Sequence, residues 1–201
     1  MNIVFAYPTG LNPQKGGVER ITDIIAKILL KRGYTIFYLN WKREQDNYEY
    51  PVPVIDLPSS NLEDPNNLEV YNRFLKENRI DVIINQHGLY EGTYFLSQVK
   101  VQNVKIISVL HSDPFGYYNH LFADLMTLRD SSIKEKVKRV ARFFLYRKVK
   151  KIIHRSLVNH YTFIQEHPQY VCLLSESYKE RLEEYCDCLL YTSDAADDLI
   201  G

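Results

Sequence analysis

Short apolar runs alternate with longer amphipathic stretches along most of this chain. The apolar runs predict strands at residues 2–7, 34–40, 52–57, 80–86, 105–112 and 170–175. The amphipathic stretches predict helices from Val18 to the residue before Gly33, at 65–78, at 90–98, at 119–166 with a break near Asp130–Ser132, and at 176–185. This alternation predicts an α/β fold: a doubly wound, mostly parallel Rossmann-like sheet with helices on both faces.

Two local features refine this picture. The first helix carries apolar residues at helical spacing, namely Val18, Ile21, Ile25, Ile28 and Leu29. Gly33 is expected to end that helix. Pro53 lacks an amide hydrogen, so the strand at 52–57 is expected at an edge of the sheet.

The composition narrows the function classes. The 201 residues are 45% hydrophobic, and 25 Lys and Arg balance 25 Asp and Glu, which disfavours a nucleic-acid-binding protein. The 3 cysteines lack the spacing of metal ligands and fit a reducing cytosol. The N-terminus has no basic leader, and no apolar stretch approaches the roughly 20 residues of a membrane span. We expect a cytoplasmic protein without a metal.

Ligands of such sheets bind beyond the carboxyl ends of the strands. The loops there, at 8–17, 85–90, 111–118 and 175–177, all carry unusual polar or glycine residues. That coincidence is the main evidence from the residues for a site.

The Gly16-Gly17 pair stands directly before the first helix. Either it makes a tight turn, or another group must approach the backbone closely. Free N–H groups and the dipole at a helix N-terminus favour an anion. The stretch is not G-x-G-x-x-G, and no Walker lysine follows, so dinucleotide and P-loop nucleotide sites are disfavoured.

His87 and His111 both follow strands and are expected to face one crevice. Each is a candidate for chemistry, or else a structural hydrogen-bond donor. Ser175 and Glu176 begin the last helix and also fit a simple N-cap with a capping acid.

Residues 134–155 hold ten Lys and Arg against one Glu. The apolar stripe of this segment consists of Val137, Ala141, Leu145, Val149 and Ile152. The segment predicts a basic amphipathic helix. Either it attaches to anionic lipid headgroups through Lys148, Lys150 and Lys151, near a lipid-linked acceptor, or it faces the core and exposes a solvated side.

Several stretches together resemble a known family. "GGVER" with "ITDIIAKILLKRGYTIFYLN", then "VLHSDPFG" and "YVCLLSESYKERLEEY", look like the N-terminal half of retaining glycosyltransferases of family 4, which have the two-domain GT-B architecture. The resemblance covers about residues 1–187. It implies an acceptor-side domain that closes over a nucleotide-sugar held mainly by a second domain.

The resemblance also implies roles for single residues. Gly16, Gly17 and Arg20 would meet the donor diphosphate, and His111 would contact the donor sugar. The remaining candidates for the crevice or the acceptor are His87, Asp113, Ser175 and Glu176. The family more often has Asp directly after this His, whereas Ser112 intervenes here.

The last fourteen residues, "CLLYTSDAADDLIG" at 188–201, resemble a translated sequencing adapter. We therefore expect the native sequence to run as one domain over 1–187, and the nucleotide-sugar domain to be missing.

The expected function is sugar transfer from a nucleotide-sugar, with no separate cofactor, to a cell-surface polysaccharide or glycolipid. The enzyme would be cytoplasmic or peripheral on the inner face of the membrane. Two alternatives remain: a nicotinamide-dependent oxidoreductase or epimerase, and a non-catalytic binding module of flavodoxin-like topology.

Overall fold

The computed structural model describes residues 1–42, 47–88, 91–126, 133–167 and 170–185. The chain divides into two compact units. The sheet unit contains residues 1–111 and 164–174, and the helical unit contains the described residues of 112–163 and 175–201. The predicted break near Asp130–Ser132 and the adapter-like tail at 188–201 lie outside the described residues. The single domain predicted over 1–187 stays a prediction.

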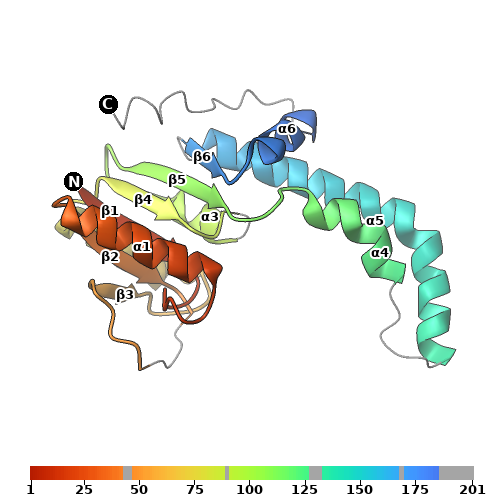
Figure 1. Ribbon diagram of the computed structural model, residues 1–201, viewed down its shortest axis with the longest axis horizontal. Helices are drawn as coiled ribbons and strands as arrows, with labels where there is room; N and C mark the ends of the chain where they lie inside the picture. The colour runs from red at the N-terminus through yellow and green to blue at the C-terminus, as the bar shows by residue number, and fades with distance from the viewer. Residues whose placement is uncertain (43–46, 89–90, 127–132, 168–169, 186–201) are drawn as a thin grey trace. The chain divides into compact units, whose positions relative to one another are not determined.

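The sheet unit is built on six parallel strands (Figure 1). They are β1 (Asn2–Tyr7), β2 (Thr35–Asn40), β3 (Val54–Asp56), β4 (Val82–Asn85), β5 (Lys105–Leu110) and β6 (Tyr170–Leu173). Their order is β3-β2-β1-β4-β5-β6, with every neighbouring pair parallel. This is the Rossmann-like order that the alternation predicted. The strand after Pro53 lies at an edge, as expected.

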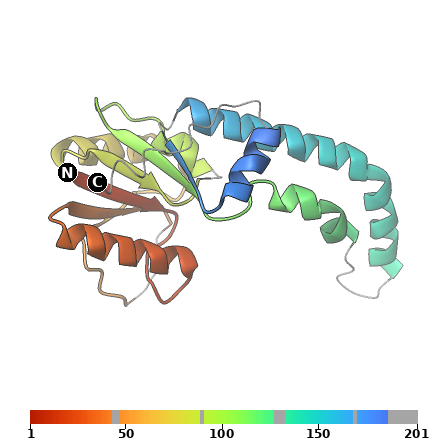
Figure 2. The ribbon, with the colours of Figure 1, turned by 45° about the horizontal axis from the view of Figure 1, so that its top comes forward.

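Helices cover both faces of this sheet. The sheet unit contains α1 (Gly17–Lys31), α2 (Pro65–Glu77) and α3 (Glu91–Leu96). Figure 2 shows α1 and α2 on opposite faces of the sheet. Side chains of β1 alternate between the two sides: Val4 and Ala6 pack in the core under α2 and α3, whereas Ile3 and Phe5 pack in the core with Ala26 of α1.

The buried face of α1 is mostly polar. Its buried residues are Glu19, Thr22, Asp23 and Ala26. The isoleucines point outward and are 37–46% exposed: Ile21, Ile24, Ile25 and Ile28. The apolar spacing therefore predicted the helix correctly without marking the side that meets the sheet.

Local bonds satisfy part of the polar face of α1, and a glycine marks where the helix ends. The Thr22 hydroxyl donates to the Val18 carbonyl at 2.7 Å, and Asp23 pairs with Lys27 at 2.7 Å. Gly33 follows the helix with φ of +83°, a conformation that L side chains rarely adopt. Gly33 thus ends the helix as predicted.

The helical unit is organised around Tyr161. It contains α4 (Gly116–Met126), most of α5 (Ile133–Glu166) and α6 (Glu176–Tyr185). The Tyr161 hydroxyl donates to the Pro114 carbonyl at 2.6 Å, and its ring lies 5.3 Å from the fully buried ring of Phe115. These contacts fix the start of α4 against α5.

Candidate functional site

Five side chains gather at the carboxyl ends of the central strands of the sheet unit. Tyr7 ends β1, Gln86 and His87 follow β4, and His111 follows β5, while Glu19 comes from the first turn of α1. We call these five residues the strand-end cluster. Contacts between the rings, a hydrogen bond and the electrostatic effects of Glu19 connect its members.

His111 is held as a neutral imidazole. Its Nε2 lies 2.5 Å from the Oε1 of Gln86. An amide oxygen only accepts, so this bond requires a proton on Nε2 and leaves Nδ1 as an acceptor. Burial lowers the pKa of His111, and the carboxylate of Glu19 partly opposes that effect. The structure therefore presents a hydrogen-bond acceptor, rather than a cation, at the end of β5.

His87 is also neutral, and its surroundings are aromatic. Its ring lies edge-on to Tyr7 at 5.8 Å and 6.4 Å from the ring of Trp41. Burial, together with the positive charge of Lys42, lowers the pKa of His87 to about 4. The backbone N–H of His87 donates to the Oδ1 of Asn85 at 3.0 Å. At neutral pH this histidine cannot provide a positive charge for an anion.

The carboxylate of Glu19 lies against the first glycine of the pair. A Cβ at Gly16 would meet the Oε2 of Glu19. Gly16 is the N-cap of α1 and has φ of −164°, an extended conformation open to any residue. The group that approaches the backbone at Gly16 is therefore the protein's own carboxylate, at the end of a flexible side chain. Burial raises the pKa of Tyr7, and the negative charge of Glu19 raises it further.

The second glycine faces open space. A Cβ at Gly17 would meet no heavy atom within 4 Å. The first turn of α1 therefore leaves room beside Gly17 for a ligand, at the helix end where N–H groups are not used within the helix. Arg20, three residues further along, has an exposed side chain.

The other predicted site residues lie in the helical unit and make structural contacts there. The Oδ1 of Asp113 accepts from the Phe115 N–H at 3.0 Å, and its Oδ2 pairs with Arg181 of α6. The Ser175 carbonyl accepts from the Tyr178 N–H at 3.1 Å. Glu176 pairs with Lys179 at 3.1 Å. The Ser175 carbonyl thus accepts the first bond of α6, whereas the Ser175 hydroxyl lies 2.9 Å from the Ser177 hydroxyl; a cap through the side chains of Ser175 and Glu176 stays a prediction.

The three lysines assigned to a membrane surface differ in environment. Lys150 lies 4.8 Å from the ring centre of Tyr118 and 5.8 Å from that of Tyr146. Tyr118, and then a hydrogen bond to Tyr146, raise the pKa of Lys150. Lys148 and Lys151 are exposed. Lys150 therefore connects α4 to α5, and the other two remain available to an external partner.

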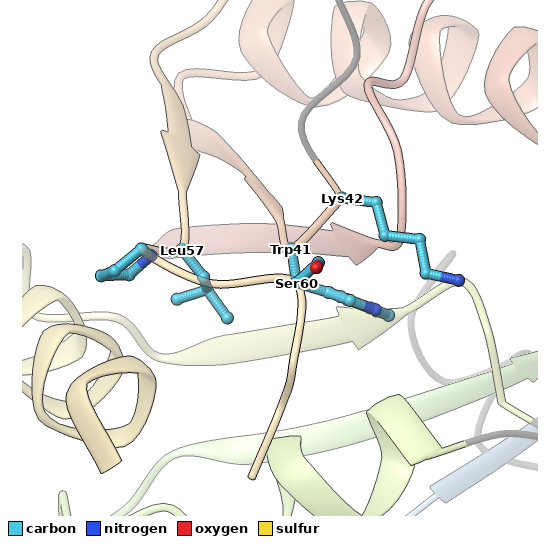
Figure 3. A pocket seen from close by; sticks show the side chains of 5 residues that line it. Trp41, Lys42, Leu57 and Ser60 are labelled. Carbon is cyan, nitrogen blue, oxygen red and sulfur yellow. The ribbon is translucent and has the colours of Figure 1, made fainter. Parts of the chain in front are cut away.

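A hollow of about 450 Å³ lies near the carboxyl ends of β2 and β3 (Figure 3). Its lining residues are Trp41, Lys42, Leu57, Pro58 and Ser60. Figure 3 shows the side chain of Lys42 extending away from Leu57. Trp41 and Lys42 line this hollow and also adjoin His87, since the Trp41 ring lies 6.4 Å from the His87 ring and the charge of Lys42 contributes to lowering the pKa of His87.

The sequence indicated both histidines but not Tyr7, Glu19 or Gln86 as their partners. Tyr7 and Gln86 are the last residues of predicted strands, and this position alone could have indicated that they lie beside the histidines. Glu19 stands three residues after the N-cap, where an acid commonly reaches back to the helix start.

Comparison with protein families and curated proteins gives no relative. No protein-family model matches the chain, and no curated protein matches it. Within the described residues, no three His, Cys, Asp or Glu side chains are placed to hold a metal ion. No helix among the residues that the structure describes combines the length and apolar character needed to cross a bilayer.

Proposed function

We propose that this chain is the acceptor-side half of a glycosyltransferase, which transfers a sugar from a nucleotide-sugar to a glycan or lipid-linked acceptor. The observation that carries the proposal is the open backbone at Gly17, at the N-terminus of a helix whose first turn also places Glu19 near His111. An anion-binding helix start beside a sugar-hydroxyl acceptor suits a sugar diphosphate.

In the proposed chemistry, the start of α1 binds the diphosphate and His111 binds the donor sugar. The N–H groups at the start of α1, with the exposed Arg20, stabilise the diphosphate as it departs. The Nδ1 of His111 accepts a hydrogen bond from a donor-sugar hydroxyl, because Gln86 holds the proton on Nε2. The nucleotide-sugar is a substrate, so no further cofactor is assigned. His87 contributes its neutral ring to the wall of the site.

Glu19 limits how tightly this half can hold a donor. Its carboxylate lies against Gly16, where it opposes a second anion. We therefore expect donor binding near the millimolar range, about −4 kcal/mol, and no sugar transfer by this chain alone. In the proposed enzyme, a second domain supplies most of the contacts to the base, the ribose and the phosphates.

Backbone NMR during titration with pyrophosphate, and then with a uridine diphosphate sugar, tests the proposal. The amide signals of Gly16, Gly17 and Val18 should shift together. Gly17→Val should weaken binding because its side chain occupies the open space, while the fold persists. Gly17→Ala is the graded control. Glu19→Gln should strengthen binding several-fold, because it removes a negative charge and keeps the shape.

Each outcome decides a separate part of the proposal. If the amide signal of Gly17 stays unchanged at tens of millimolar ligand, the start of α1 does not bind a diphosphate. Micromolar binding would overturn the two-domain division of the donor site. Equal binding by the wild type and by Gly17→Val would show that the ligand does not occupy the open space beside Gly17.

The proposal includes attachment to an anionic membrane on the cytoplasmic side, where a lipid-linked acceptor would lie. The exposed Lys148 and Lys151 support such a contact. Lys150 does so less, since its charge lies against Tyr118 and Tyr146.

A further inference from the structure

The N-terminal part of α5 exposes an apolar stripe that shares only Val137 with the stripe predicted from the sequence. Val137, Val140 and Phe144 are 64%, 56% and 78% exposed. Their spacings of three and four residues place them on one side of the helix. Phe143 and Leu145 border the stripe and are also more than half exposed. The alternative that this part of the helix faces the core does not hold for these residues.

Basic residues surround this stripe. Within 134–145 the sequence has one acid, Glu135, against five basic residues, namely Lys134, Lys136, Lys138, Arg139 and Arg142. Lys134, Lys136 and Lys138 are exposed. Lys134 lies three residues before Val137 and Lys136 four residues before Val140, so cations flank an exposed apolar stripe, as in helices that lie in the surface of an anionic bilayer.

The positions that follow Phe144 show where the apolar stripe ends. Residues four and seven positions further along the same side of the helix are Lys148 and Lys151, both exposed. Long lysine side chains at the end of an apolar stripe reach lipid phosphates while their stems stay in apolar surroundings. The apolar part of the stripe thus spans two turns, from Val137 to Phe144, and two cations follow it.

We propose that residues 134–151 of α5 dock in the headgroup region of an anionic bilayer, with Val137, Val140 and Phe144 inserted and Lys148 and Lys151 on the phosphates. Charge selects this occupant over a second copy of the chain. Two such helices would bring nine cations and one anion from each side together around a small apolar stripe, whereas an anionic surface neutralises them. The inference rests on the membrane attachment within the proposed function and assigns the side chains that make it.

Co-sedimentation with vesicles tests the docking. The full chain should bind vesicles of phosphatidylcholine mixed with phosphatidylglycerol, and added salt should weaken that binding. The double variant Val137→Ser with Phe144→Ser should lower the partition coefficient by at least about tenfold, because two inserted side chains are lost. It should keep its helical circular dichroism, because both side chains are exposed.

Single lysine variants provide a matched control. Lys148→Gln and Lys150→Gln each remove one charge from the same helix. Only Lys148→Gln should reduce vesicle binding, since Lys150 is held against Tyr118 and Tyr146. Equal effects of both variants would show a general attraction of charge and would overturn the assignment of the stripe.

Tryptophan quenching by brominated lipids tests insertion directly. The chain has one tryptophan, Trp41, which is 1% exposed and serves as an internal reference. Phe144→Trp should add a signal that brominated anionic vesicles quench. Tyr94→Trp, at an exposed position on α3, should add a signal that they do not.

Two results would overturn the docking. One is vesicle binding that the double serine variant leaves unchanged. The other is a dimer of the wild type in gel filtration that the same variant dissociates, because the stripe would then belong to a contact between copies. Neither result depends on the Gly17 amide signals, so failure of the docking and failure of the diphosphate site are separable.

Discussion

The neutral state of His87 makes the stability of the sheet unit depend on pH. The pKa of His87 falls to about 4 in the folded chain from an ordinary value of 6.5. Between these values the unfolded chain takes up a proton that the folded chain does not. Acidification therefore favours unfolding, the loss of stability grows as the pH falls from 6.5 to 4, and it is complete below 4.

The size of this loss follows from the same two values. The difference corresponds to about 3 kcal/mol, at about 1.4 kcal/mol for each pH unit. Water reaches part of the ring of His87, and the contribution of Lys42 is screened, so we expect about 1–2 kcal/mol. Most of the effect should persist in high salt, because burial is the larger cause and salt does not remove it.

Urea denaturation at a series of pH values measures the effect, with His87→Phe as the comparison. Phenylalanine keeps a ring beside Tyr7 and Trp41 and does not titrate. The difference in unfolding free energy between the two proteins should change between pH 6.5 and 4 and be constant above. NMR of the His87 ring protons should give the pKa itself. A midpoint near 6.5 would refute the reasoning.

Three further changes probe packing, each by urea denaturation. Gly88→Ala should destabilise by about 1–3 kcal/mol, because its Cβ would lie 2.8 Å from a Leu110 methyl group and 3.0 Å from the Val109 carbonyl; wild-type stability would show that the strand end yields. Gly92→Ala places a Cβ 2.7 Å from the Trp41 ring and should lower the free energy of unfolding. Gly17→Ala, at the open helix position, should not lower it, and equal effects of the two variants would contradict the contact at Gly92. Tyr161→Phe should cost about 1–3 kcal/mol, since it leaves the Pro114 carbonyl without its donor; a smaller loss would mean that water replaces the hydroxyl.

The sequence predicted the sheet because its signals are local. Runs such as residues 3–6 and 105–110 are mostly apolar, as expected for parallel strands covered on both faces. The edge position of β3 followed from Pro53, and the end of α1 from Gly33. Strand ends in turn placed His87 and His111 at one edge of the sheet.

What the sequence could not predict depends on which surfaces meet. Helical spacing gives the angle between side chains but not the side of α1 that packs on the sheet. Here the small Ala26 and the short Thr22 allow close packing, and the larger isoleucines remain outside. The hydrogen bond from His111 to Gln86, like the hollow beside Trp41, joins residues far apart in the chain, so no local pattern marks it.

The two glycines at the start of α1 have different surroundings, and this difference affects how an anion could bind there. A helix N-terminus carries roughly half a positive charge, which the negative charge of Glu19 opposes. Gly16 allows that carboxylate to fold back against the backbone, and Gly17 leaves the adjacent space open. A diphosphate at Gly17 would therefore bind more tightly once Glu19 moves away. Moving Glu19 would also remove its effect on the pKa values of Tyr7 and His111. Within the proposed function, Glu19 thus couples ligand binding at the helix start to the pKa values of Tyr7 and His111. In the Glu19→Gln variant, ligand binding should no longer change these pKa values.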